Sequence, residues 1–208
     1  MVDAVILCGG YGTRLSGVVP PDYPKALAVV NGRPFLGILL DHLRAVGFKL
    51  VVLCTGVGAA LIDEHVVAYC YASWVTTVRD ERLGYGTWNA ILKASSLVTT
   101  DPFFVLNGDT FCALNYEGML GRHRCSPFQL TRAIDVDGVP VGTFVMNRGL
   151  LASRPVPSGS VNLEDVIGAD LCPAGLVLDY VTATAWYDIG TPEGLARFRE
   201  VKKDTAWL

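Results

Sequence analysis

Apolar residues in the first half of this chain follow two alternating patterns. Short continuous apolar runs are typical of strands buried on both faces of a sheet, and they alternate with longer segments whose apolar residues recur at helical spacing. The predicted strands are Val2–Leu7, Leu50–Cys54, Trp74–Val78 and Pro102–Leu106, and the predicted helices are Pro34–Val46, Ala59–Ala68 and Trp88–Leu97. This order predicts an α/β fold with a mostly parallel sheet and right-handed crossovers.

The second half has a different pattern. The turn at 135–138 separates two apolar runs, as in a pair of adjacent strands, and a Pro/Ser/Gly-rich loop follows. The predicted elements are strands Gln129–Ile134, Val139–Met146 and Gly175–Tyr180, the loop Arg154–Gly159, and helices Asn162–Gly168 and Pro192–Val201. We expect this half to extend the sheet and to wall off one side of a cleft.

Composition narrows the class of protein. At 208 residues the chain suits one domain with a sizeable core. Half of its residues are apolar, which excludes disorder, and a net charge of −3 makes nucleic acid an unsuitable partner. No apolar run reaches the roughly 20 residues that span a bilayer, so we expect a cytoplasmic protein without a membrane partner. The six cysteines form no Cys-x-x-Cys pair, and the three histidines lack metal-ligand spacing.

The first predicted strand runs into a glycine-rich loop, Cys8-Gly9-Gly10-Tyr11-Gly12-Thr13-Arg14-Leu15, and Pro24-Lys25 follows. Glycines after a strand let backbone N–H groups approach a ligand and form a concavity for anions. Arg14 is suited to forked phosphate contacts and Lys25 to a point contact. The spacing predicts a polyphosphate site.

Other glycine motifs do not fit this loop. A dinucleotide fingerprint would need glycine at Leu15, and the chain has no Gly-Lys-Ser/Thr of a P-loop. A simple tight turn would explain the glycines alone, but it would not need Thr13-Arg14 and Lys25 at these intervals.

Two carboxylates also stand where ligands bind in open α/β sheets. Asp109, in Asn107-Gly108-Asp109-Thr110, directly follows a predicted strand, and Asp188 lies in Tyr187-Asp188-Ile189-Gly190-Thr191-Pro192. Each motif taken alone fits a turn or a helix cap equally well.

Together, these motifs resemble the signature of the sugar-phosphate nucleotidyltransferases, most of all the short heptose-1-phosphate guanylyltransferases. The resemblance implies a Rossmann-like, three-layer fold with a mixed, mostly parallel central sheet in one domain over 1–208. Residues 1–111 would form the nucleotide-binding part, and residues 112–208 the acceptor-binding part and C-terminal helix. It also implies Mg²⁺ held by Asp109 and Asp188, and it is compatible with a homo-oligomer.

The resemblance assigns roles residue by residue. The catalytic residues would be Arg14, Lys25, Asp109 and Asp188. The nucleotide would bind Leu7, Gly9, Gly10, Gly12, Thr13, Arg14, Gly84, Gly86, Thr87, Asn107 and Gly108. The acceptor would bind Trp88, Asn89, Gly142 and Thr143.

The chain departs from the family pattern in two places. Trp88 and Asn89 replace two glycines where base and acceptor meet; the Trp88 ring would either border the pocket or pack inward, and we expect it to border the pocket. The stretch between Phe111 and Tyr187 lacks clear Glu-Lys and Asn-Gly-Gly elements, for which Val141-Gly142-Thr143-Phe144 is a thin substitute. The segment Pro155–Asn162 is an alternative acceptor loop.

The resemblance implies transfer of a nucleoside monophosphate, with GTP favoured, to a heptose or hexose 1-phosphate, as in nucleotide-sugar supply for capsule or lipopolysaccharide. CTP or UTP with another phosphorylated acceptor is the alternative enzyme. A module that binds nucleotide without turnover is the alternative from another class, and retention of Asp109 and Asp188 argues against it.

Overall fold

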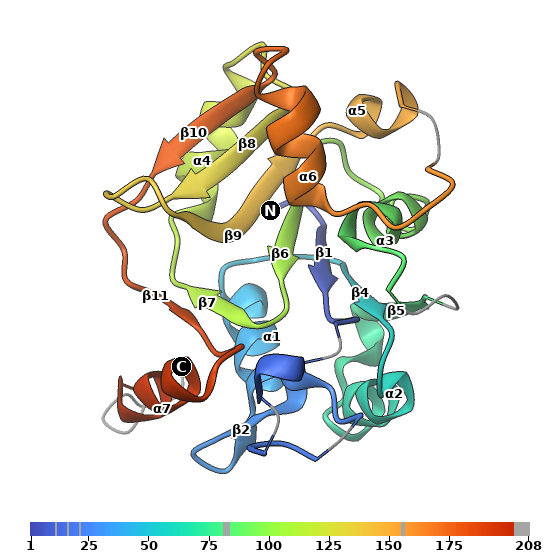
Figure 1. Ribbon diagram of the computed structural model, residues 1–208, viewed down its shortest axis with the longest axis vertical. Coiled ribbons are helices and arrows are strands. Elements are labelled where there is room, and N and C mark those ends of the chain that lie inside the picture. Colours follow the sequence, from blue (N-terminus) through green and yellow to red (C-terminus); the bar gives the residue numbers. More distant parts are fainter. Residues whose placement is uncertain (11, 16, 21, 81–83, 155–156, 202–208) are drawn as a thin grey trace.

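The computed structural model describes residues 1–10, 12–15, 17–20, 22–80, 84–154 and 157–201. Within them, the central feature is a seven-stranded sheet of order β10-β8-β9-β6-β1-β4-β5 (Figure 1). Its strands are β1 Ala4–Leu7, β4 Val51–Thr55, β5 Val75–Arg79, β6 Phe103–Asn107, β8 Leu130–Ile134, β9 Pro140–Met146 and β10 Val177–Val181.

The sheet is mixed but mostly parallel. Strands β6, β1, β4 and β5 run parallel to one another, whereas β9 is antiparallel to both β6 and β8, and β10 is parallel to β8. The predicted fold class is therefore confirmed. The parallel strands all end at the same edge of the sheet, which is where such folds bind ligands.

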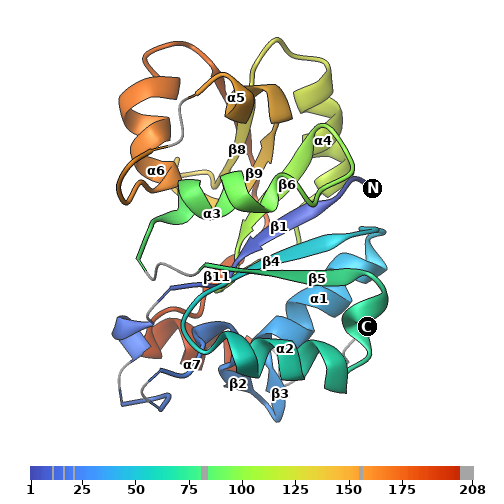
Figure 2. The same cartoon turned by 90° about the vertical axis from the view of Figure 1, so that its right-hand side faces the viewer.

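Helices cover both faces of the sheet and give three layers (Figure 2). They are α1 Phe35–Ala45, α2 Ala59–Ala68, α3 Thr87–Ala94, α4 Tyr116–Arg124, α5 Arg148–Ala152, α6 Leu163–Val166 and α7 Pro192–Val201. A π-helical turn over Ile167–Leu171 continues α6.

The core consists of two clusters, one on each face. In β1, Ala4 and Ile6 pack in the cluster that holds α1, α2 and α4, whereas Val5 and Leu7 pack in the cluster that holds α3, α5 and α6. Alternate side chains of a strand point to opposite faces. The continuous apolar run of β1 therefore follows from burial on both sides.

Most predicted elements are present, some with shifted ends. Helices α2 and α7 have the predicted bounds, and α1 ends before Gly47, whose φ of +93° a glycine adopts without strain. The prediction missed α4, whose sequence is polar and contains Gly118 and Gly121. Its available signal was Asn115, which caps the helix by accepting a hydrogen bond from the Gly118 N–H at 2.9 Å.

Two small antiparallel pairs lie outside the main sheet: β2 Val29–Val30 with β3 Arg33–Pro34, and β7 Thr110–Cys112 with β11 Trp186–Asp188. Sequence patterning predicted neither pair, because strands of two or three residues carry no usable period. In the second pair Thr110 lies opposite Asp188. This pairing joins the end of β6 to the chain entering α7.

No helix of the described chain is long and apolar enough to cross a membrane.

Candidate active site

A cleft of about 330 Å³ opens at the carboxyl ends of the parallel strands. Its lining comes from the ends of β1, β4, β5, β6 and β11 and from the starts of α3 and α6. It comprises Leu7, Gly9, Gly10, Arg14, Lys25, Cys54, Thr55, Asp80, Gly84, Tyr85, Gly86, Thr87, Ala90, Asn107, Asp109, Thr110, Asn162, Glu164 and Asp188.

The backbone after β1 passes very close to the backbone after β4. A Cβ added at Gly56 would lie 2.6 Å from the Gly9 carbonyl oxygen, and one added at Gly9 would lie 3.4 Å from the Gly56 nitrogen. The Cys8 N–H also donates to the Cys54 carbonyl at 2.8 Å. Glycine is therefore needed here for close backbone packing as well as for access to a ligand.

The Lys25 side chain extends along the glycine loop. A Cβ added at Gly12 would lie 3.5 Å from Lys25 Cβ, and one added at Gly10 would lie 3.5 Å from Lys25 Cε. The Lys25 ammonium then donates to Asp109 Oδ2. An added Cβ would make ordinary van der Waals contact with the lysine at both positions, so Gly12 is favoured by its φ of +63° and not by lack of space.

The β7–β11 pair brings Asp109 and Asp188 together although 79 positions separate them in sequence. The Ile189 N–H donates to the Asp109 carbonyl at 2.8 Å. A Cβ added at Gly190 would lie 2.7 Å from Asp188 Oδ1 and 2.9 Å from Asp109 Oδ2. The two carboxylates therefore converge on one side of Gly190.

Arg14 completes this charged group. Its guanidinium lies 3.5 Å from Asp188 and 4.0 Å from Asp109, and the side chain is 59% exposed, against 8% for Asp109. This charged group thus contains two cations and two anions. Substrate phosphates could replace the carboxylates as partners of Arg14 and Lys25. The arginine favours this exchange because its side chain is exposed to solvent and its ion-pair distances are long.

The neighbouring Cys8 is not a nucleophile at this site. Burial and the nearby Asp109 carboxylate raise the pKa of its thiol to about 12. A thiolate is the reactive form of cysteine, so this thiol stays inert at neutral pH.

The MobA-like NTP transferase domain model matches residues 4–116, which include the glycine loop, Lys25 and Asp109. The chain belongs to this family. Its seven-stranded sheet and helical layers have the Rossmann-like nucleotidyltransferase fold that the resemblance implied.

Curated relatives of this MobA-like domain include D-glycero-alpha-D-manno-heptose 1-phosphate guanylyltransferases from two bacteria. The Campylobacter jejuni enzyme is 35% identical over 111 residues, covering 53% of this chain and 48% of the relative. The Aneurinibacillus thermoaerophilus enzyme is 33% identical over 134 residues, covering 64% and 57%. The chain therefore spans only about half the length of these relatives.

Among solved structures, HddC from Yersinia pseudotuberculosis matches with a TM-score of 0.81 and 26% identity, covering 98% of this chain and 100% of HddC. A second HddC structure, complexed with GMP-PN, matches with the same TM-score and identity. The likeness extends over both halves of the MobA-like chain, beyond the residues that the family model matches.

Most residues that the sequence picked out line one cleft. Catalytic candidates Arg14, Lys25, Asp109 and Asp188 all do. Of the nucleotide-binding candidates, Leu7, Gly9, Gly10, Gly84, Gly86, Thr87 and Asn107 do, whereas Gly12, Thr13 and Gly108 are not lining residues. Gly108 still has a role in packing: its Cβ would lie 2.7 Å from Cys8 Sγ.

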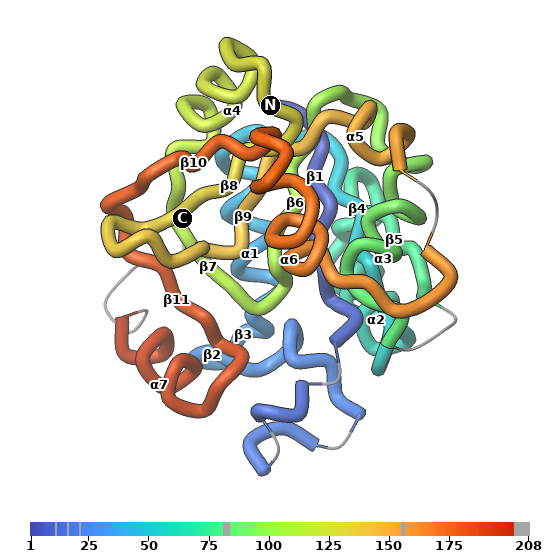
Figure 3. The backbone as a smooth tube through the Cα atoms, turned by 45° about the horizontal axis from the view of Figure 1, so that its top comes forward, coloured from blue at the N-terminus to red at the C-terminus, as the bar shows by residue number. Residues whose placement is uncertain are grey.

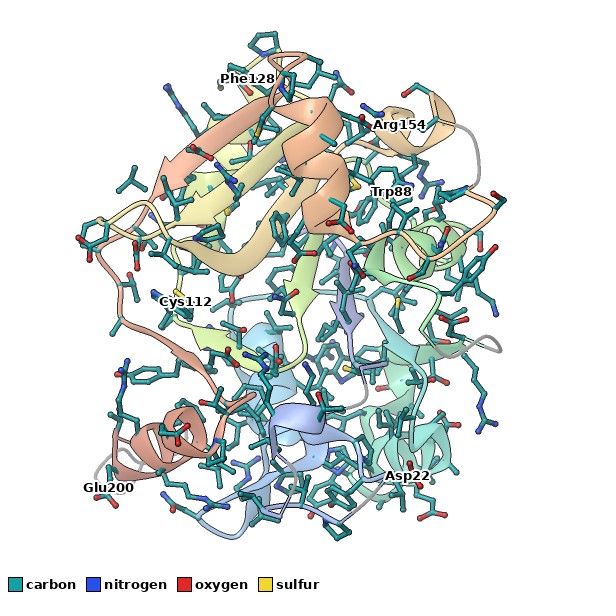
Figure 4. The ribbon with its side chains drawn as sticks, viewed as in Figure 1. Asp22, Trp88, Cys112, Phe128, Arg154 and Glu200 are labelled. Atoms are coloured by element: carbon teal, nitrogen blue, oxygen red, sulfur yellow. The ribbon has the colours of Figure 1, made fainter. Side chains whose placement is uncertain are left out.

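The acceptor candidates are placed differently. The expectation that Trp88 borders the pocket is wrong: its ring is 1% exposed and packs in the core on the α3 side (Figure 4). Asn89 is also buried and outside the cleft lining. Gly142 and Thr143 lie in β9 away from the lining, with Gly142 making room for the Asn107 amide. The physical reason in the case of Trp88 is that α3 packs on β1 and β4, and the ring joins the core cluster on that face of the sheet.

Several lining residues escaped the sequence analysis. Asp80 directly follows β5, and its N–H donates to the Thr55 carbonyl at 2.8 Å, so its position at a strand end was the available signal. Glu164 was also missed; it reaches the cleft from the start of α6, beside Asn162, the last residue of the alternative acceptor loop. Of the positions interpreted above, Tyr11 and residues 155–156 lie outside the described residues.

Proposed function

We propose that this chain is a sugar-1-phosphate nucleotidyltransferase that transfers a nucleoside monophosphate, with GTP favoured, to a heptose or hexose 1-phosphate and releases pyrophosphate. The observation that carries the proposal is the convergence of Arg14, Lys25, Asp109 and Asp188 beside the glycine loop. The heptose 1-phosphate guanylyltransferase relatives and the HddC complex with GMP-PN support this substrate pair.

The reaction needs no protein nucleophile. A phosphate monoester is largely dianionic at neutral pH, because its second pKa is about 6. One acceptor phosphate oxygen attacks the α-phosphorus in line, the bond to the bridging oxygen breaks, and pyrophosphate leaves with the electron pair. The protein contributes position and charge balance.

The residues divide this task by their place in the cleft. Gly9 and Gly10 let the backbone approach the triphosphate, and Arg14, exposed at the mouth, neutralises the phosphates that leave. Lys25 is held more deeply, alongside Asp109. It is suited to bridging the α-phosphate and the acceptor phosphate, whose mutual repulsion opposes the attack.

Asp109 and Asp188 fit a divalent metal ion such as Mg²⁺. One oxygen of each carboxylate lies close to Gly190, where Arg14 Nη2 also lies, and carboxylate oxygens are hard ligands. No group of three His, Cys, Asp or Glu suited to a metal occurs in the described part of the chain, so phosphate oxygens and waters would supply the remaining ligands. When bound, Mg²⁺ supplies Lewis-acid neutralisation of phosphate charge.

We further propose that residues 1–111 provide most of the nucleotide site and that residues 112–208 complete the acceptor side. Asp188, in the second part, would hold the metal ion together with Asp109 in the first part, so neither part would be sufficient for catalysis alone. The triphosphate substrate favours a cytoplasmic reaction.

Pyrophosphate release tests the function directly. The chain is assayed with GTP, CTP, UTP and dTTP against a panel of heptose and hexose 1-phosphates. We expect the highest kcat/KM with GTP. Preference for CTP or UTP would show that the enzyme selects cytosine or uracil and not guanine. Binding of nucleotide without turnover on any substrate pair would favour the module that binds nucleotide without catalysis.

A further inference from the structure

The cleft has a second wall, opposite the charged group, and one of its lining residues, Glu164, has no role in the function proposed above. It consists of the start of α3, residues 84–89, and the 157–164 segment that leads into α6. Figure 3 shows these two stretches, green and orange, running side by side. Asn162 and Glu164 line the cleft from the second stretch.

We propose that Glu164 binds hydroxyl groups of the acceptor sugar, and that Asn89 is a positioning residue that holds the 157–164 segment in place for it. The proposal rests on the proposed function and names the side chain that would determine the acceptor.

Backbone hydrogen bonds join the two stretches. The Val161 N–H donates to the Tyr85 carbonyl at 3.2 Å, and the Trp88 N–H donates to the Val161 carbonyl at 3.0 Å. Between them, Gly86 packs so tightly that an added Cβ would lie 2.1 Å from the Val161 carbonyl oxygen. The 157–164 segment is therefore fixed to the start of α3 like a short added strand.

Asn89 reinforces this junction from within. Its Nδ2 donates to the Tyr85 carbonyl at 2.5 Å and to the Gly159 carbonyl at 2.9 Å, and the side chain is buried. Both amide hydrogens are thus used to tie the two stretches together. A glycine at position 89 could not do this. The departure of this chain from the family pattern therefore has a structural purpose on this wall.

The starts of α3 and α6 also cap each other. The Leu163 N–H donates to Thr87 Oγ1 at 2.8 Å, and the Thr87 N–H donates to Asn162 Oδ1 at 3.4 Å. Asn162 forms a capping box with Asp165 as well. These contacts occupy Asn162 and Asp165 and leave Glu164, between them in the helix turn, to point its carboxylate elsewhere.

Glu164 has the chemistry to bind hydroxyl groups. It is exposed and makes no ion pair or side-chain hydrogen bond with any described residue. An ionised carboxylate only accepts hydrogen bonds, so its ligand must present donors. Phosphates present none, whereas adjacent sugar hydroxyls can donate to both oxygens. In Figure 1, α6 lies beside β9 and β6, away from β5.

The test measures KM for the sugar 1-phosphate and for GTP separately. Glu164→Gln retains one acceptor oxygen but loses the charge, and we expect KM for the acceptor to rise about tenfold while KM for GTP changes less than about twofold. The matched control is Glu117→Gln. Glu117 is also an exposed first-turn glutamate, but it lies in α4, away from the cleft.

Deoxy analogues of the acceptor identify the hydroxyls involved. Wild-type protein should discriminate against the analogue that lacks the bound hydroxyl, and Glu164→Gln should lose most of that discrimination. Asn89→Asp places a carboxylate against two carbonyl oxygens and should also raise the acceptor KM. The double variant should be little worse than the weaker-binding single variant, since both changes act on one contact.

The outcomes separate the two proposals. Turnover by Glu164→Gln with an unchanged acceptor KM, or with a raised KM for GTP instead, overturns the assignment of Glu164 and leaves the proposed function standing. Absence of turnover by the unmodified protein on every pair overturns the proposed function and the acceptor assignment together. If Asn89→Asp does not fold, Glu164→Gln, at an exposed position, still decides the question.

Discussion

The two walls of the cleft are built on different principles. The strand-end wall holds the glycine loop, Lys25, Asp109 and Asp188; backbone pairing of β7 with β11 brings the two carboxylates together, and the charged side chains then form ion pairs. The α3–α6 wall is also joined by backbone groups, but its side-chain contacts, from Asn89, Thr87 and Asn162, are neutral hydrogen bonds. The first wall carries the positive side chains that can bind phosphates, whereas the second holds the α3 and α6 segments in a fixed position beside the cleft. We therefore expect substitutions in the first to remove chemistry and substitutions in the second to alter acceptor binding and stability.

The largest effect is expected from the carboxylates of the strand-end wall. Asp188→Asn should lower kcat by roughly 100-fold or more, because a neutral amide cannot balance the charge of a metal ion on the phosphates. Asp109→Asn should be as severe, and the double variant should be about as inactive as the worse single one. Steady-state assays at limiting Mg²⁺ measure this.

Asp179→Asn is the control for the carboxylates, since Asp179 pairs with Arg132 on the exposed face of β10. Wild-type turnover by Asp188→Asn would show that Asp188 is only a turn residue and that other groups hold the metal ion.

Arg14→Ala should separate chemistry from stability. The side chain is 59% exposed and its ion pairs are long, so the free energy of unfolding should change by under about 0.5 kcal/mol. Turnover should fall sharply because the phosphates lose a charged contact. Thermal unfolding and pyrophosphate release, measured on the same sample, check both parts. An unfolded variant would make Arg14 a structural residue.

Gly86→Ala tests the other wall through its backbone. Gly86 has φ of +92° and no room for a Cβ beside Val161, so we expect a loss of more than about 1 kcal/mol in stability. For a domain of this size that is a fall in Tm of at least about 2 °C. Gly159→Ala, where an added Cβ meets nothing within 4 Å, should stay close to wild type. Equal stabilities would mean that the two stretches are not held together by this contact.

The smallest effect concerns Trp88. Because its ring is buried in the core and lies outside the cleft lining, GTP should leave its fluorescence nearly unchanged. A variant in which phenylalanine replaces Trp74, Trp186 and Trp207 isolates the signal. Strong quenching would show that nucleotide binding changes the packing of α3. The α3–α6 wall would then respond to a ligand bound at the strand-end wall.

The strand-end wall could be predicted well because its signals are local. A strand that ends in Gly9-Gly10, with Arg14 and Lys25 at fixed intervals, points to phosphate whatever the rest of the fold does. The parallel β1, β4 and β6 strands likewise produce continuous apolar runs, since both faces are buried. Asp109 could be placed because it directly follows such a strand.

Other features were decided only by the tertiary structure. The meeting of Asp109 with Asp188 depends on the pairing of β7 with β11, two three-residue strands that no sequence pattern announces. Trp88 could have faced either way from the start of α3, and packing of α3 on the sheet buried it. Glu164 reaches the cleft because Val161 and Asn89 fix the 157–164 segment to a turn more than 70 positions earlier. Sequence by itself determined the residue chemistry and local periodicity of this protein, whereas long-range backbone pairing decided which of those residues face one cleft.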